Sequence, residues 1–292
     1  MEVAYYPGCT LKANARNFED SALFACEKLD IEIKELSRWN CCGTVFSLST
    51  DDLIHHMAPV RNLIRVEENG SNRVMTLCAM CYNTLKRANE RVKADPESLE
   101  KLNRVMYKEE VDYQGNVEVV HMLELLRDEI EFTNLASKVI KPLNNLKVAC
   151  YYGCMLVRPE GIGFDDIENP SVLEDLIHVL EGQPVDFPFK TECCGAYQTV
   201  DKPDIIAERT DQIINSARNR GAEVMVMACP LCAFNLDHRQ KITRQVYSGF
   251  RGMPVLYFSQ LLALALGCGT ETLKFDLHYF NPEPILKEKG LI

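Results

Sequence analysis

The chain has 292 residues, of which 47% are hydrophobic and 25% are charged, and its formal net charge is −10. This ordinary globular composition excludes long disordered regions, collagen and coiled coils. The excess of acidic residues repels phosphate backbones, so we do not expect nucleic acid as a partner.

No apolar run approaches the roughly 20 residues that cross a bilayer. The longest candidate covers residues 261–266 only. Residues 1–6 carry no basic segment of a secretory signal and have the character of a strand. We therefore expect a cytoplasmic protein without direct membrane insertion.

In the first half of the chain, short β-branched runs alternate with apolar stretches of helical period. We expect strands at residues 31–36, 73–77 and 117–120, and helices at residues 18–29 and 53–66. The charged segment 97–114 is expected to form a helix and a loop at the surface.

The second half repeats this alternation. Strands are expected at residues 147–152, 184–189, 223–228 and 254–258, and helices at residues 172–180 and 204–220. The polar tail after Gly267 is expected to be irregular. Alternating strands and helices indicate an α/β fold with parallel sheets flanked by helices. We expect two pseudo-twofold-related repeats, residues 1–143 and 144–292.

Cysteine is the anomalous residue, with 13 copies. Ten of them form two copies of one pattern, in which a lone cysteine precedes a Cys-Cys-Gly triplet and then a Cys-x-x-Cys pair. The first set is Cys9, Cys41, Cys42, Cys78 and Cys81, and the second set is Cys154, Cys193, Cys194, Cys229 and Cys232. The cysteines follow predicted strands, where open parallel sheets place their sites. We therefore expect the two sets at a shared cleft, at the C-terminal ends of the strands.

Three kinds of site use cysteines in this way. Structural zinc takes four ligands, commonly from two Cys-x-x-Cys pairs. A zinc site therefore remains an alternative for one of the two sets. Thiol–disulfide exchange needs a Cys-x-x-Cys pair alone and leaves the other cysteines without a role. An iron–sulfur cluster accepts thiolates from dispersed positions and uses all five of a set. No ferredoxin-type cysteine run occurs in the sequence, so we expect electrons to arrive from another protein of a complex.

The paired pattern resembles the cysteine-rich CCG domains found in the B subunit of heterodisulfide reductase from methanogenic archaea, over nearly the whole chain. The opening Tyr5-Tyr6-Pro7-Gly8-Cys9 and the late Leu277-His278-Tyr279 are similar to that protein in particular. Related subunits of fumarate, glycolate, lactate and glycerol-3-phosphate complexes share the repeats. They give the alternative interpretation, an iron–sulfur protein that only transfers electrons.

The resemblance implies two noncubane 4Fe-4S clusters, one at each set, with one cluster and one zinc ion as the alternative. It implies reduction of the coenzyme M–coenzyme B heterodisulfide to two thiols, the last step of methanogenesis, and so a disulfide oxidoreductase. Each cluster is expected to take one sulfur of the substrate. The implied partners are the ferredoxin-like C subunit of heterodisulfide reductase, which donates electrons, and its flavin-containing A subunit. A hydrogenase or formate dehydrogenase is implied in the same complex.

Glycines flank the cysteines of both sets. We expect Gly43 and Gly195, and likewise Gly8 and Gly153, to let the backbone pass close to a cluster without a Cβ atom. The three remaining cysteines are Cys26, Cys150 and Cys268, and we expect them to be structural thiols.

The heterodisulfide is anionic, so cations should line the cleft. Lys12, Arg16 and Arg158 follow the lone cysteines and are candidates, although a solvated helix face explains each equally well. His278 is a candidate proton donor. His121 is expected to open a helix after a buried strand, with Phe258 at the matching position of the second repeat.

Overall fold

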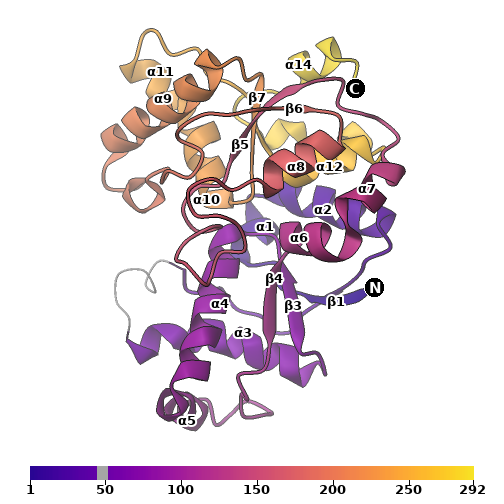
Figure 1. The fold of residues 1–292 in the computed structure, drawn as a ribbon. Helices are drawn as coiled ribbons and strands as arrows, with labels where there is room; N and C mark the ends of the chain where they lie inside the picture. The colour runs from indigo at the N-terminus through magenta and orange to yellow at the C-terminus, as the bar shows by residue number, and fades with distance from the viewer. Residues whose placement is uncertain (45–51) are drawn as a thin grey trace.

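The computed structural model describes residues 1–44 and 52–292, and it contains two four-stranded parallel sheets, one from each half of the chain (Figure 1). The first sheet has the order β2-β1-β3-β4 and consists of β1 (Glu2–Tyr5), β2 (Glu32–Glu35), β3 (Arg73–Thr76) and β4 (Glu118–His121). The second has the order β6-β5-β7-β8 and consists of β5 (Lys147–Tyr151), β6 (Gln183–Val185), β7 (Val224–Met227) and β8 (Val255–Tyr257). The predicted α/β class is confirmed.

The two sheets have the same strand order, and all of their strand pairs are parallel. In the first, Val3 pairs with Ile33, and Ala4 pairs with Val74. In the second, Val148 pairs with both Pro184 and Val224. Every residue of β7 is buried, as expected for a central parallel strand that helices cover on both faces.

Helices connect the strands in both halves. The first half contains α1 (Cys9–Ala13), α2 (Arg16–Lys28), a 3-10 helix η2 (Leu53–His56), α3 (Met57–Glu68), α4 (Ala79–Ala94), α5 (Pro96–Val105), α6 (Met122–Leu125), a π-helix η3 (Leu126–Ile130) and α7 (Phe132–Lys138). The second half contains α8 (Val172–Val179), η4 (Ala196–Gln198), α9 (Pro203–Asn219), α10 (Pro230–Ala233), a π-helix η5 (Phe234–His238), α11 (Gln240–Val246) and α12 (Phe258–Ala265). Among the described residues, no helix combines the length and the apolar character that a membrane span requires.

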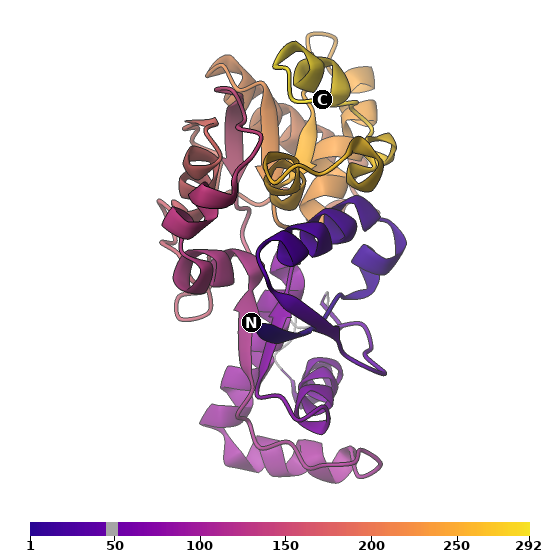
Figure 2. The ribbon, with the colours of Figure 1, turned by 90° about the vertical axis from the view of Figure 1, so that its right-hand side faces the viewer.

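Each half packs one helix, from the segment after its last strand, against the other half. Helix α12, which follows the last strand of the second sheet, packs against α2 of the first half (Figure 2). Helix α7, which follows the last strand of the first sheet, packs against α8 of the second half. The ring of Phe18 stacks on Tyr257 at 4.2 Å between centroids, and Ser21 hydrogen-bonds to Ser259 at 2.6 Å. Helices α7 and α12 therefore each belong to one half by sequence but contact the other half. The proposed division at residue 143 stays a prediction.

The tail after Gly267 is not irregular, and that prediction is wrong. It forms α13 (Thr270–Leu273), the 3-10 helix η6 (Phe275–Leu277) and α14 (Glu283–Glu288). These helices are too short for a helical period to show in the sequence, but Leu273, Phe275 and Leu286 are buried. Helix α13 packs against α2, so the tail closes over the junction of the two halves.

Candidate two-cluster metal centre

The topology places every cysteine of both sets after a strand, at the carboxyl end of its sheet. Cys9 begins α1 directly after β1, and Cys154 follows β5. Cys78 is the N-cap of α4 after β3, and Cys229 is the N-cap of α10 after β7. A helix N-terminus favours the thiolate over the thiol, and the thiolate is the form that binds metals.

The first set gathers from three segments of the first half. The Sγ atoms of Cys9 and Cys41 lie 3.6 Å apart, and those of Cys42 and Cys81 also lie 3.6 Å apart. Cys78 lies close enough to Cys81, within the Cys-x-x-Cys pair, for that thiol to influence its pKa. Cys9 and Cys41 are exposed, whereas the other three are buried. One side of this set therefore faces solvent.

The second set repeats this arrangement. The Sγ atoms of Cys194 and Cys232 lie 3.4 Å apart, and Cys154 hydrogen-bonds to Cys193. The backbone N–H of Gly195 donates to the Sγ atom of Cys193 at 3.3 Å. Cys154 and Cys193 are partly buried, so this set is more enclosed than the first.

The two sets meet at their Cys-x-x-Cys pairs. The side chains of Cys78 and Cys229 lie close enough to shift each other's pKa, raising that of Cys78 and lowering that of Cys229. Beside this contact, the N–H of Ala79 donates to the carbonyl of Ala228 at 2.9 Å. The pseudo-twofold relation thus joins the two sets into one continuous group of thiols.

Thiols packed this closely share their protons unequally. The pKa of Cys193 is lowered to about 2, chiefly because Cys154 and Cys194 hydrogen-bond to its thiolate. In the first set, hydrogen bonds from Cys41 and Cys81 hold the pKa of Cys42 well below its ordinary value. Metal binding requires thiolates and releases the remaining protons.

Two glycines stand against the thiols, as predicted. A Cβ atom at Gly8 would lie 2.9 Å from Sγ of Cys81, and one at Gly153 would lie 3.3 Å from Sγ of Cys232. The φ angles of the two glycines are 74° and 64°, which other residues rarely adopt. The lone-cysteine turns therefore approach the thiols closely because their glycines lack a side chain.

For the other two glycines, the close approach to a cluster stays a prediction. A Cβ atom at Gly43 would meet Ala58 at 3.3 Å, and one at Gly195 would meet Ile206 at 2.8 Å. Ala58 lies on α3 and Ile206 lies on α9. Both glycines have φ near 78°, so the positions still demand glycine.

The arrangement of the ten thiols indicates which of the predicted metal sites they suit. Within residues 1–44 and 52–292, no three His, Cys, Asp or Glu side chains stand close enough to hold a single metal ion. The thiols instead form pairs that converge from separate segments on one region. Thiolates spread in this way fit a cluster of several irons better than one zinc ion.

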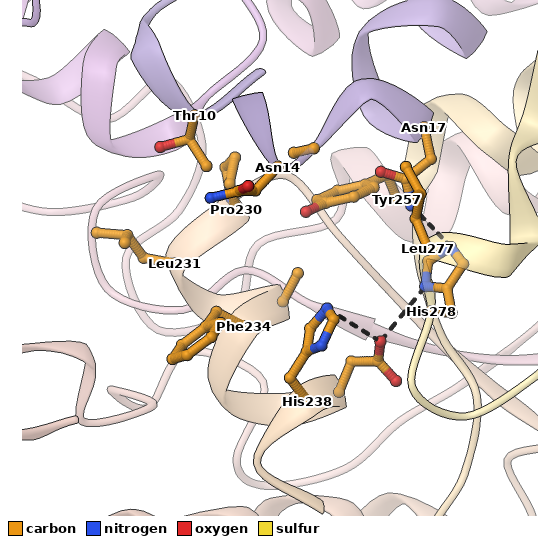
Figure 3. A pocket seen from close by; sticks show the side chains of 13 residues that line it. Thr10, Asn14, Asn17, Pro230, Leu231, Phe234, His238, Tyr257, Leu277 and His278 are labelled. Atoms are coloured by element: carbon orange, nitrogen blue, oxygen red, sulfur yellow. Dashed lines mark hydrogen bonds and ion pairs between the residues drawn. The ribbon is translucent and has the colours of Figure 1, made fainter. Parts of the chain in front are cut away.

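A cavity of about 210 Å³, the inter-repeat cavity, lies between the two halves beside this centre (Figure 3). Its lining residues come from α1, α2 and the turn between them, from α10 and η5, from the end of β8 and from the tail: Thr10, Asn14, Ala15, Asn17, Pro230, Leu231, Ala233, Phe234, Asp237, His238, Tyr257, Leu277 and His278. Two of these, Pro230 and Leu231, stand between the cysteines of the second Cys-x-x-Cys pair. The cavity therefore borders the second set directly.

Asp237 organises the polar side of the inter-repeat cavity. Its carboxylate accepts the backbone N–H groups of Tyr279 and Phe280 at 2.8 and 3.0 Å, which anchors the tail. His238 and His278 face it, with Nε2 at 3.9 Å and Nδ1 at 3.6 Å respectively (dashed lines in Figure 3). Sequence reasoning missed Asp237 and His238, although the Asp-His dipeptide after the second Cys-x-x-Cys pair has no equivalent in the first repeat.

His278 lines this cavity but is tightly held. The amide of Asn17 donates to its Nε2 atom at 2.9 Å, and the amide of Gln260 lies at the same distance. Asn17 belongs to the first half and Gln260 to the second, so His278 joins the halves. Its role as proton donor stays a prediction.

Two of the three predicted cations, Lys12 and Arg158, form ion pairs within their own half of the chain. Lys12 forms ion pairs with Glu19 at 2.8 Å and with Glu35 at 2.7 Å. Arg158 pairs with Glu168 at 3.0 Å and donates to the carbonyl of Thr191. Neither these two residues nor Arg16 lines the inter-repeat cavity. A carboxylate partner far along the chain cannot be read from sequence spacing.

The remaining three cysteines lie outside the two sets. Cys26, Cys150 and Cys268 are all buried within the apolar core. Burial raises the pKa of Cys26 to about 12, which keeps its thiol protonated. Their surroundings are those of structural thiols.

Comparison with known proteins identifies the repeats. The family described as the cysteine-rich domain (CCG) matches residues 3–86 and 148–237, which contain both sets in full. A protein of Wolinella succinogenes, named as the membrane anchor subunit of an 8-methylmenaquinol:fumarate reductase, is 35% identical over 93% of this chain and 94% of its own. The B subunit of a ferredoxin/F(420)H(2)-dependent CoB-CoM heterodisulfide reductase from Methanosarcina acetivorans is 29% identical over 94% and 92%.

A solved structure supports the fold. A hypothetical protein from Helicobacter pylori superposes with a TM-score of 0.77 over 95% of this chain, at 15% identity. This chain spans 51% of the length of that protein. At such low identity the likeness extends to the fold alone.

Proposed function

The chain belongs to the cysteine-rich domain family, and we propose that it binds an iron–sulfur cluster at each set and is the two-cluster subunit of a reductase complex. The observation that carries this proposal is the contact between Cys78 and Cys229, which brings the two sets together. Bound clusters would supply single electrons, and two neighbouring clusters can accept or deliver an electron pair. The named relatives are subunits of such complexes.

The first candidate reaction is reduction of the coenzyme M–coenzyme B heterodisulfide at a pair of noncubane clusters, as expected from the sequence. The relative from Methanosarcina acetivorans supports it. The substrate carries a sulfonate, a phosphate and carboxylates, so its site needs cations. None of the residues that line the inter-repeat cavity is Lys or Arg, and Asp237 adds a negative charge.

The second candidate, which we favour, is a subunit that takes electrons from a quinol in a complex of the fumarate reductase type. The relative from Wolinella succinogenes carries such a name and has the higher identity of the two. A hydroquinone is neutral and offers two hydroxyl donors on an apolar ring. The inter-repeat cavity, which holds no basic side chain except two histidines, matches that chemistry.

Particular side chains in the cavity are available to such a ring. The Oδ1 atom of Asn17 is buried and has no hydrogen-bond partner among the described residues, so it can accept a hydrogen bond from one hydroxyl of the hydroquinone. The hydroxyl of Tyr257 points into the cavity, where Leu231 and Phe234 form an apolar side (Figure 3). His238 is half-exposed and faces Asp237, so it can pass the two protons of the hydroquinone to solvent one after the other, while the two electrons would go to the clusters.

One experiment separates the two candidates. Iron-loaded protein is mixed without oxygen with the soluble quinol menadiol, and cluster reduction is followed by electron paramagnetic resonance. In parallel, dithionite-reduced protein receives the heterodisulfide, and oxidation of a reduced viologen is recorded. We expect reduction by menadiol and no heterodisulfide turnover; the opposite result would restore the first candidate.

Matched variants locate the site. His238→Gln and Asn17→Leu should slow reduction by menadiol at least tenfold. His178→Gln changes an exposed histidine on α8, away from the cavity, and should leave the rate unchanged. Equal rates in all three variants would show that the quinol binds elsewhere.

A further inference from the structure

The side chain of Asn235 touches a cysteine of the second set, and no amide side chain among the described residues makes the matching contact to Cys42 in the first. It lies in the π-helix η5, three residues after Cys232. Its amide nitrogen donates to the carbonyl of Cys194 at 3.0 Å and reaches the Sγ atom of the same residue at 3.8 Å. Because a carbonyl can only accept, this contact fixes the orientation of the amide.

The Oδ1 atom of the same amide shows that packing alone does not account for an asparagine at position 235. Asn235 is fully buried, yet its Oδ1 atom has no hydrogen-bond partner among the described residues. A buried acceptor without a partner destabilises a fold, and an apolar residue of the same shape would avoid that cost. The hydroxyl of Thr210 holds the backbone carbonyl of Asn235 at 3.1 Å, so the position is fixed.

The first repeat has a different side chain at the equivalent position. Its counterpart, three residues after Cys81, is Thr84 on the regular helix α4. The hydroxyl of Thr84 hydrogen-bonds to Thr44 at 3.3 Å, and Thr44 donates to Cys42, the counterpart of Cys194. The pseudo-twofold symmetry is therefore broken at the side chain that approaches the buried cysteine of each Cys-Cys pair.

We propose that Asn235 is a positioning residue that raises the reduction potential of the cluster at the second set, through its amide hydrogen bond to Cys194. An N–H donor withdraws electron density from a ligand sulfur and so stabilises the reduced cluster, which carries more negative charge. Asn235 thereby sets the potential of the second set separately from that of the first. The inference rests on the proposed function, since it requires clusters at both sets.

The test is a redox titration of the iron-loaded full chain, followed by electron paramagnetic resonance. The double variant Cys193→Ser with Cys194→Ser, which keeps only the first set, assigns each midpoint potential. In Asn235→Leu, the midpoint of the second set should fall, and that of the first set should stay unchanged. Iron content should equal that of the unchanged protein.

Gln240→Leu is the matched control. Gln240 is another fully buried amide, and its hydrogen bonds among the described residues go to the backbone of Leu236 and Met253 rather than to a cysteine. Its loss should weaken the fold without moving either midpoint. If Asn235→Leu fails to fold, Asn235→Thr, which carries the side chain of the first repeat, should show the same fall.

Unchanged midpoints in the Asn235 variants, or equal shifts in the Gln240 variant, would overturn the inference. Absence of iron from the unchanged protein would instead overturn the proposed function, so the two failures are distinguishable.

Discussion

The side chains of Cys78 and Cys229, which are 151 positions apart in the sequence, lie close enough at the junction of the two sheets for each to shift the pKa of the other. Each is the N-cap of a helix that follows a central strand, so the contact joins equivalent places of the two repeats. Because both strands end at this junction, neither set can be described as an isolated site.

This contact predicts magnetic coupling between the two proposed clusters. In the fully reduced protein, electron paramagnetic resonance should show broadened or split signals, because unpaired spins at short range interact. The double variant Cys193→Ser with Cys194→Ser should give a sharp signal from the first set alone. Identical line shapes in the two proteins would contradict the proximity of the clusters.

The cysteine sets predict the metal content. Anaerobically purified protein should contain about eight irons and no zinc if each set holds a four-iron cluster. Cys42→Ser should lose the iron of the first set, whereas Cys26→Ala, a change in the core, should lose none. About four irons with one zinc would instead favour the mixed-metal alternative.

Both sets should be required for turnover. Cys41→Ser with Cys42→Ser removes the first set, and Cys193→Ser with Cys194→Ser removes the second. We propose that the reaction moves an electron pair through both clusters. Each double variant should therefore lose all activity in whichever assay, menadiol oxidation or heterodisulfide reduction, the unchanged protein is active in. Half of the activity remaining in either variant would mean that one cluster suffices.

The close approach at Gly8 predicts a selective effect. Gly8→Ala places a Cβ atom 2.9 Å from Sγ of Cys81 and strains a φ angle of 74°, so the first set should lose its iron. Gly70→Ala is the matched control, because its φ angle is 71° and no atom lies within 4 Å of the added Cβ. It should cost about 1–2 kcal/mol of stability and keep all of the iron. Equal iron loss in both variants would point to backbone strain alone.

His121 predicts a pH dependence of stability. The ring is fully buried; Nε2 donates to the carbonyl of Leu77 at 2.7 Å, and Nδ1 accepts the N–H of Leu123 at 3.2 Å. Burial lowers the pKa of His121 from 6.5 to about 3. Between these values the unfolded chain binds a proton that the folded chain excludes. The free energy of unfolding should therefore fall with decreasing pH, by up to about 1.4 kcal/mol per unit.

The measurement for His121 is denaturant unfolding at several pH values between 4 and 7. His121→Gln removes the titrating ring, so the difference between the two proteins isolates its contribution from that of the cysteine sets. The variant should show a shallower slope below pH 6. The same slope in both proteins would show that His121 is not the source.

The second-repeat counterpart of His121 shows where sequence matching fails. The alignment by strand ends predicts Phe258, but the register pairs Thr76 with His121 and Met227 with Tyr257. Tyr257, not Phe258, is therefore the equivalent residue. The prediction was wrong by one position because the ends of short strands are set by pairing with neighbouring strands.

The sequence by itself determined the repeat, the membership of each cysteine set and the parallel α/β architecture. These follow from local properties: the spacing of cysteines along the chain, and the periods of strands and helices. The glycines before the lone cysteines were also predictable, because a turn that approaches a thiol leaves no room for a Cβ atom.

Only the tertiary structure decided the contact of Cys78 with Cys229, the packing of α7 and α12 against the opposite halves, and the neutralisation of Lys12 by Glu19 and Glu35. Each of these depends on how rigid elements sit against one another. Periodicity reports which face of an element is buried, but it does not report what covers that face. The cavity between the halves, and the buried amide of Asn235 beside Cys194, exist only after that packing is complete.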